Sequence, residues 1–104
     1  MMTDAFKEKL AQLNAEYRDA LPGKFADMDA LWARYPDAGA LADLHRLLHT
    51  MAGSAKVFGF AALGIAAREV ENALAPIVKE GGATDAKLHR RIDALLQSLR
   101  QAAI

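Results

Sequence analysis

The sequence predicts an all-α protein: an antiparallel up-and-down four-helix bundle with an additional or kinked N-terminal helix. Alanine is abundant and β-branched residues are sparse, a composition that favours helix over sheet. Apolar residues recur at spacings of three and four almost throughout the chain, and short segments rich in proline and glycine separate the periodic stretches. Connections this short place consecutive helices antiparallel. We therefore expect residues 1–104 to form one helical domain with a single core.

The first periodic segment begins after a Thr3 cap and runs to about residue 20, and a second covers residues 22–35. Proline suits the first turn of a helix, so Pro22 favours a new start there. The same pattern also permits one helix that is kinked at Pro22. Both arrangements remain open at this point.

Three further helices are predicted downstream. They cover residues 37–57, residues 60–80 with a bend at Pro76, and a final segment that begins at a Thr84 or Asp85 cap and ends near residue 102. Together with the N-terminal segments, these helices supply the members of the bundle.

The composition excludes several classes of function. Thirteen basic residues balance thirteen acidic ones, so the chain has no net field to attract nucleic acid or an anionic membrane. The absence of cysteine excludes disulfides and thiolate chemistry and fits a reducing compartment. The first residues lack the apolar core of a signal peptide, and no apolar run is long enough to span a bilayer. We expect a cytoplasmic protein that binds neither nucleic acid nor membrane.

The predicted helix over residues 37–57 carries a histidine that points outward. At about 100° per residue, His49 lies roughly 130° from the apolar stripe of this helix, whereas His45 lies about 90° from it, at the border. Gly53, one turn beyond His49, destabilises a helix interior by roughly 1 kcal/mol relative to alanine. We interpret Gly53 as clearance that lets another protein reach the imidazole, as in-line phosphoryl transfer requires. The alternative is that Gly53 permits close packing of another helix. The stripe consists of Leu41, Leu44, Leu48, Met51 and Ala55.

The helix over residues 60–80 places a carboxylate near this histidine. Its flank of Gly64, Arg68, Glu71 and Ala75 is displaced from its apolar seam in the same rotational sense as His49, and Glu71 lies about as far beyond the turn as His49 lies before it. A carboxylate that accepts a hydrogen bond from Nδ1 leaves the Nε2 lone pair free to attack. The alternatives for Glu71 are a solvated acid or an ion pair with Arg68. The seam consists of Leu63, Ala67, Val70, Leu74 and Ile77.

These residues resemble the histidine-containing phosphotransfer (HPt) domains of two-component signalling. His49 is followed by Met51, Gly53, Ser54 and Gly59 in the spacing of that family. The segment FGFAALGIAAREVENAL is similar to the corresponding helix in the N-terminal HPt domain of chemotaxis histidine kinases, and the resemblance covers about residues 41–75.

The resemblance implies a phosphorelay intermediate that works as a monomer. His49 would accept a phosphoryl group from a sensor histidine kinase or a receiver-domain aspartate and pass it to a response-regulator receiver aspartate. Glu71 would orient His49.

One position departs from the family pattern, because the common lysine three residues after the histidine is Ala52 here. We predict that Lys56 supplies the missing positive charge, with Arg68 as a second candidate, although Lys56 is equally consistent with a solvated surface residue. The expected docking face for a receiver domain consists of Ala52, Gly53, Lys56, Gly64 and Arg68.

The chain carries neither a glycine-rich nucleotide loop nor an acidic cluster with metal-ligand spacing near His49. We therefore expect a protein that is not an enzyme by itself and that has no cofactor, with Mg²⁺ supplied by the partner receiver domain.

Two other readings differ in class from phosphotransfer. His45 and His49 have the i, i+4 spacing of paired metal or haem ligands, but the sequence offers no further ligand near them. A helical adaptor that binds a signalling partner without phosphoryl chemistry is the main alternative, with Ala52 as the mark of lost activity.

Overall fold

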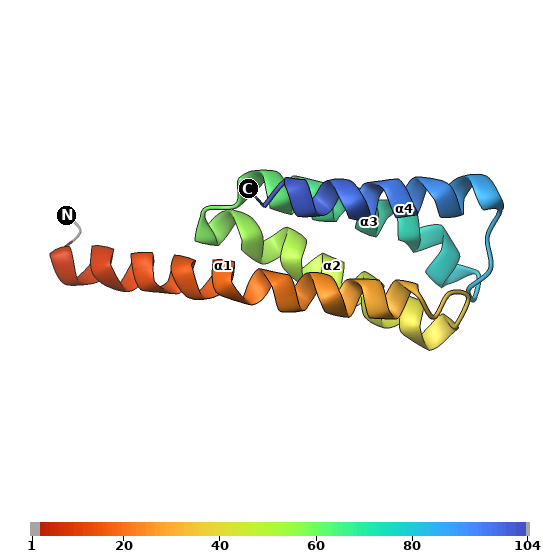
Figure 1. Ribbon diagram of the computed structural model, residues 1–104, viewed down its shortest axis with the longest axis horizontal. Helices are drawn as coiled ribbons and strands as arrows, with labels where there is room; N and C mark the ends of the chain where they lie inside the picture. Colours follow the sequence, from red (N-terminus) through yellow and green to blue (C-terminus); the bar gives the residue numbers. More distant parts are fainter. Residues whose placement is uncertain (1–2, 104) are drawn as a thin grey trace.

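The computed structural model describes residues 3–103, which form a helical bundle without β-strands. Consecutive long helices run antiparallel and side by side, in a molecule that measures 52 × 20 × 20 Å (Figure 1). The predicted all-α bundle is confirmed. Its elements are α1 (Asp4–Trp32), α2 (Ala38–Ser54), the 3₁₀ helix η1 (Ala55–Phe58), α3 (Ala61–Lys79) and α4 (Ala86–Gln101).

Helix α1 decides between the two arrangements that the sequence left open for the N-terminal region. It continues through Pro22 as one helix, so no additional N-terminal helix exists within residues 3–103. Pro22 removes a single hydrogen bond, to the carbonyl of Arg18, and both residues are exposed, so that this carbonyl is not sealed in the core. The buried Leu21 and Met28 continue the same seam on both sides of the proline. Packing of this seam therefore outweighs the local helix-breaking tendency.

Helix α2 ends three residues earlier than predicted. It stops at Ser54, and the tighter η1 turn follows before Gly59, which adopts a φ of 89°. This left-handed conformation favours glycine and ends the helical segment. Asp85 is the cap of α4, as predicted, and α3 continues through Pro76 to Lys79.

The core lies where the four helices meet. Every residue of the two predicted seams is buried, with exposed fractions of 0 to 2%. Full burial of a leucine or isoleucine side chain stabilises the fold by about 1.5–3 kcal/mol, so these seams fix the register of α2 against α3. The other two helices contribute Leu21, Met28 and Trp32 from α1 and Ile92, Leu96 and Leu99 from α4.

The N-terminal third of α1 extends beyond the other helices (Figure 1). Residues 3–12 are all exposed. Tyr17 packs against the bundle, because its ring stacks on Phe58 with 4.9 Å between the ring centroids and its hydroxyl lies 3.1 Å from Ser54 Oγ. Tyr17 thus anchors α1 to the segment where α2 changes into η1.

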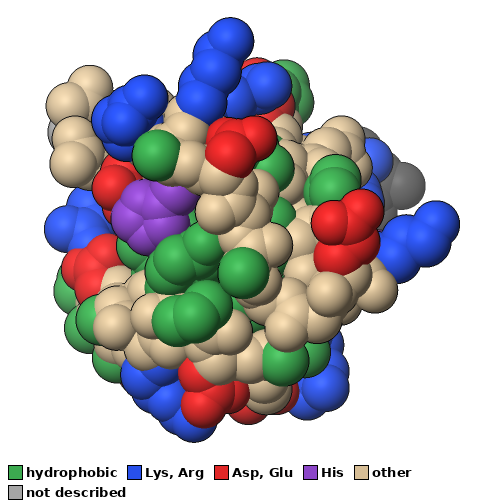
Figure 2. Space-filling view, turned by 90° about the vertical axis from the view of Figure 1, so that its right-hand side faces the viewer, with side chains coloured by type: hydrophobic (Ala, Val, Ile, Leu, Met, Phe, Trp, Pro, Cys, Tyr) green, Lys and Arg blue, Asp and Glu red, His purple; other side chains and the backbone are tan. Residues whose placement is uncertain are grey.

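The surface carries charges of both signs. At the end of the molecule where α1 joins α2 and α3 joins α4, acidic and basic side chains are interspersed around the outline (Figure 2). This mixture agrees with the balanced charge of the sequence. None of the described helices is long and apolar enough to cross a membrane.

Asp37 caps α2, and its titration provides a test of this fold. Its Oδ1 accepts a hydrogen bond of 2.9 Å from the backbone N–H of Ala40, and Arg34 donates a bond of 3.2 Å to Oδ2. The backbone bond, followed by the Arg34 bond, lowers the pKa of the Asp37 carboxyl below its usual range. A carboxylate whose pKa is lower in the folded than in the unfolded protein stabilises the fold at any pH above its pKa in the unfolded protein. This contribution disappears as the pH falls through the pKa of the folded protein.

We therefore expect Asp37→Ala to lower the melting temperature at neutral pH, with a difference from the unsubstituted protein that narrows below about pH 3.8. Thermal unfolding followed by circular dichroism across this range is the measurement. Asp19→Ala, on an exposed part of α1, serves as the control. Equal melting temperatures for Asp37→Ala and the unsubstituted protein at pH 7 would contradict the capping role.

Candidate functional site

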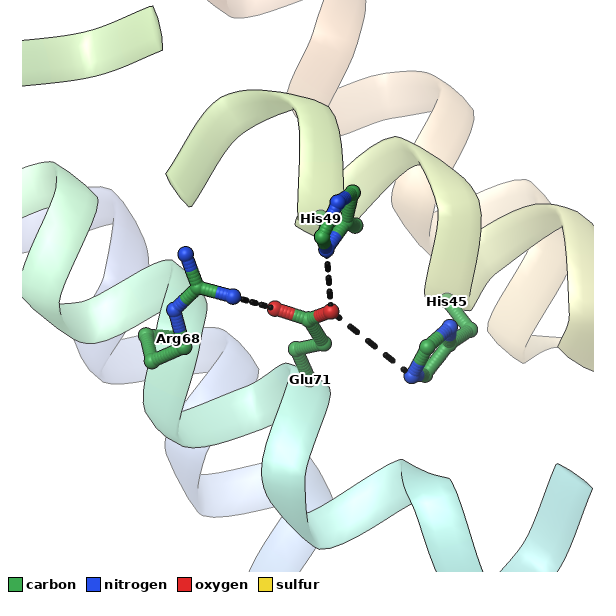
Figure 3. A network of polar contacts seen from close by, with 4 residues as sticks. All are labelled: His45, His49, Arg68 and Glu71. Carbon is green, nitrogen blue, oxygen red and sulfur yellow. Dashed lines mark hydrogen bonds and ion pairs between the residues drawn. The ribbon is translucent and has the colours of Figure 1, made fainter. Parts of the chain in front are cut away.

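His49 projects from α2 toward α3, where it meets a buried carboxylate. Its Nδ1 lies 2.6 Å from Glu71 Oε2 (Figure 3). The His49 side chain is 64% exposed, whereas the Glu71 side chain is 9% exposed. Because an ionised carboxylate can only accept, Nδ1 donates the proton in this hydrogen bond. Nε2 is therefore unprotonated in the neutral imidazole, and its lone pair belongs to an exposed side chain.

The second oxygen of Glu71 is occupied as well. Arg68 donates from Nη1 to Oε1 at 2.7 Å. A buried carboxylate requires such partners, because an unpaired charge away from water is strongly unfavourable. The contact with His49 and the ion pair with Arg68, which the sequence offered as alternatives, therefore exist together. The third alternative, a solvated acid, is wrong.

His45 is the residue of the site that sequence reasoning missed. The prediction that it lies at the border is confirmed, since its side chain is 31% exposed. Its Nε2, however, lies 3.8 Å from the same Glu71 oxygen that binds His49 (Figure 3). The i, i+4 spacing of the two histidines was the available signal, because such residues are neighbours on one face of a helix.

Gly53 leaves open space one turn beyond His49. A Cβ atom built on Gly53 would have no neighbour within 4 Å. The alternative that Gly53 permits close packing of another helix is therefore wrong, and the clearance interpretation agrees with the geometry. Close approach occurs instead at Gly64 of α3, where a Cβ would lie 3.4 Å from the carbonyl oxygen of Ala52.

This close approach corrects part of the predicted docking face. Ala52 and Gly64, which we expected to be exposed, are buried where α2 and α3 meet. They still line a shallow hollow of about 390 Å³ whose rim is exposed. Its lining includes Ala52, Lys56, Gly64, Ile65 and Arg68.

Lys56 lies in η1 and not in the longer helix that was predicted over residues 37–57. Its side chain is exposed, and it has neither an ion pair nor a side-chain hydrogen bond with any residue of the described chain. It lines the same hollow as Arg68, so the two candidate cations border one surface beside α2 and α3.

The described residues contain no group of three or more His, Cys, Asp or Glu side chains arranged to hold a metal ion. The two histidines of α2 instead share one carboxylate oxygen that is hydrogen-bonded to His49.

The family described as Hpt domain matches residues 2–102 of the chain. No curated protein and no solved structure matches the chain.

The open space at Gly53 leads to a prediction on stability and access. Gly53→Ala should raise the free energy of unfolding by roughly 0.5–1 kcal/mol, because alanine favours a helix interior and its methyl group meets no neighbour. Gly53→Leu should instead slow the modification of His49 by diethyl pyrocarbonate, because a longer side chain covers the imidazole. Urea unfolding and mass spectrometry measure these effects. A loss of stability in Gly53→Ala would show that the glycine serves packing.

Proposed function

Because the chain belongs to the Hpt domain family, whose members are phosphotransfer modules of two-component signalling, we propose that His49 is its phosphoryl acceptor and donor. His49 takes a phosphoryl group from a sensor histidine kinase or from a receiver-domain aspartate, and passes it to a response-regulator receiver aspartate. The protein is a carrier in this scheme, and the partner supplies Mg²⁺ and the remaining catalytic groups.

The observation that carries this proposal is the exposed His49 imidazole with Nδ1 bound to Glu71. The other two histidines are less accessible, with side chains 31% and 33% exposed. His89 packs against two aromatic rings, with its ring centroid 4.6 Å from those of Trp32 and Tyr35. Of the three histidines, His49 therefore offers the best access to a partner.

Glu71 supports the chemistry through the Nδ1 proton. The Nε2 lone pair forms a bond to phosphorus while the bond from phosphorus to the aspartyl oxygen breaks, and the aspartate leaves as a carboxylate. Positive charge develops on the imidazole during this step, and the Glu71 carboxylate stabilises it through the Nδ1–H hydrogen bond. The return step reverses these bond changes, with the receiver aspartate as the nucleophile.

The hollow beside His49 suits a transient partner. Its exposed rim combines the Ile65 side chain, which is 65% exposed, with the cations Lys56 and Arg68, while Ala52 and Gly64 form its floor. An apolar centre with a charged rim is typical of small protein interfaces. We place the receiver domain on this surface and on Gly53, in a complex with a monomeric, cytoplasmic carrier.

A helical adaptor without phosphoryl chemistry is the second candidate. The observation that favours it is Ala52, which stands where the family commonly has a lysine. Ala52 is buried and carries no charge that could bind a phosphate. Mass spectrometry after incubation with a phosphorylated receiver separates the candidates, because an adaptor gains no phosphoryl group.

Label transfer to histidine variants tests the acceptor. A phosphorylated receiver domain carrying ³²P should label the unsubstituted protein, His45→Gln and His89→Gln, but not His49→Gln, because glutamine lacks the nucleophilic nitrogen. Circular dichroism confirms that each variant is folded. Label on His49→Gln would refute the assignment.

Lys56 has a separate test. Lys56→Ala should slow phosphoryl transfer roughly tenfold, because a lost contact between a charged group and phosphate amounts to about 1.5 kcal/mol or more. Lys87→Ala is the matched control, because it removes one positive charge at an exposed position of α4, away from the proposed docking surface. Single-turnover transfer rates are the measurement, and an unchanged rate in Lys56→Ala would leave Lys56 without a part in the chemistry.

A further inference from the structure

We propose that His45 is a positioning residue whose protonation weakens the hold of Glu71 on His49 and thereby slows phosphoryl transfer at low pH. The inference rests on the proposed role of His49 and concerns a second imidazole that faces the same carboxylate. In this proposal His45 acts on His49 through Glu71 and does not contact the phosphoryl group.

The geometry leaves His45 poised beside an oxygen that is already in use. Glu71 Oε2 binds His49 at 2.6 Å, and Oε1 binds Arg68 at 2.7 Å. His45 Nε2 lies 3.8 Å from Oε2, too far for a hydrogen bond but within the distance of an ion pair (Figure 3). A shift of about 1 Å would turn this approach into a hydrogen bond. The two imidazoles therefore approach one acceptor from adjacent turns of α2.

The charged groups around His45 define what its proton can do. Glu71 faces His45 from α3, with Arg68 behind it, and His49 lies one turn away on α2. Asp43 and Arg46 form an ion pair with each other at 3.4 Å. Together with Asp27 of α1, they line a groove on another flank of α2. Within residues 3–103, Glu71 is the one acid that approaches His45 within ion-pair distance.

Protonation changes His45 from a neutral neighbour into a cation. Histidine is the side chain that makes this change between about pH 8 and pH 5. A cationic His45 attracts Oε2 and competes with the Nδ1–H of His49 for it, and it also opposes the positive charge that develops on His49 during attack. Because Glu71 is 6% exposed, water screens this effect poorly. We therefore expect transfer to decline with falling pH more steeply when His45 is present than when a neutral residue replaces it.

The ratio of two rates isolates this effect. Transfer from one phosphorylated receiver domain is measured for His45→Gln and for the unsubstituted protein between about pH 5.5 and pH 8.5. Because both proteins meet the same donor, the ratio cancels the pH dependence of the donor. We expect the ratio of variant to unsubstituted rate to rise at least roughly threefold from the highest to the lowest pH. The same ratio for His89→Gln should stay constant.

A permanent cation at this position provides the second arm. His45→Lys should transfer more slowly than His45→Gln throughout the range, because its charge opposes His49 at every pH. His45→Asn repeats the neutral substitution with a shorter side chain if His45→Gln is unstable by circular dichroism. A residue with a merely structural role would change the rate by a factor that does not depend on pH.

A constant ratio for the neutral variant, or equal rates for His45→Lys and His45→Gln, would overturn the inference. Either result leaves the proposed function intact as long as His49→Gln gains no label. Label on His49→Gln would instead refute the proposed function itself, so the two failures are distinct.

Discussion

The site depends on one buried carboxylate whose two oxygens have different partners. Arg68 holds Oε1 of Glu71 from the same helix, and this bond both compensates the buried charge and fixes the rotation of the carboxylate. Oε2 is thereby directed at α2, where it meets His49 Nδ1. Without Arg68, the carboxylate would lose a charge-assisted bond and gain freedom to rotate. Arg68 thus contributes to the orientation of the exposed imidazole through Glu71, without touching the imidazole itself.

The bundle supplies the precision that this arrangement needs. The seams of α2 and α3 are almost completely buried, and they fix the axial register that brings His49 opposite Glu71. Gly64 brings the two helices close together beside the site, since a Cβ there would lie 3.4 Å from the Ala52 carbonyl oxygen. At Gly59 the chain turns from η1 toward α3 through a left-handed conformation. The two seams and two glycines therefore place the exposed His49 imidazole beside a buried carboxylate.

Sequence periodicity was sufficient for the fold and for the principal contact of the site. The alternation of three and four spacings defined both seams, and the register counted from the turn placed Glu71 beside His49, because regular helices convert sequence distance into spatial distance. The same reasoning failed where regularity ends. It extended the helix that carries His49 through the residues of η1, and it left open whether α1 is divided at Pro22, because packing against distant residues is invisible in a local pattern.

Periodicity also could not distinguish Gly53 from Gly64. Both lie within helices, but Gly53 borders open space whereas Gly64 lies against the neighbouring helix. Nor could it show that His45 approaches Glu71, because side-chain rotamers decide that distance.

The central claim is that Glu71 holds the Nδ1 proton of His49 and leaves Nε2 free to attack. Nitrogen-15 NMR of the imidazole measures this tautomer directly. At about pH 8.5, where a histidine is ordinarily neutral, the account predicts that His49 carries its proton on Nδ1 and that Glu71→Gln reduces the population of this tautomer. A proton on Nε2 in the unsubstituted protein, or the same tautomer population in Glu71→Gln, would contradict the account.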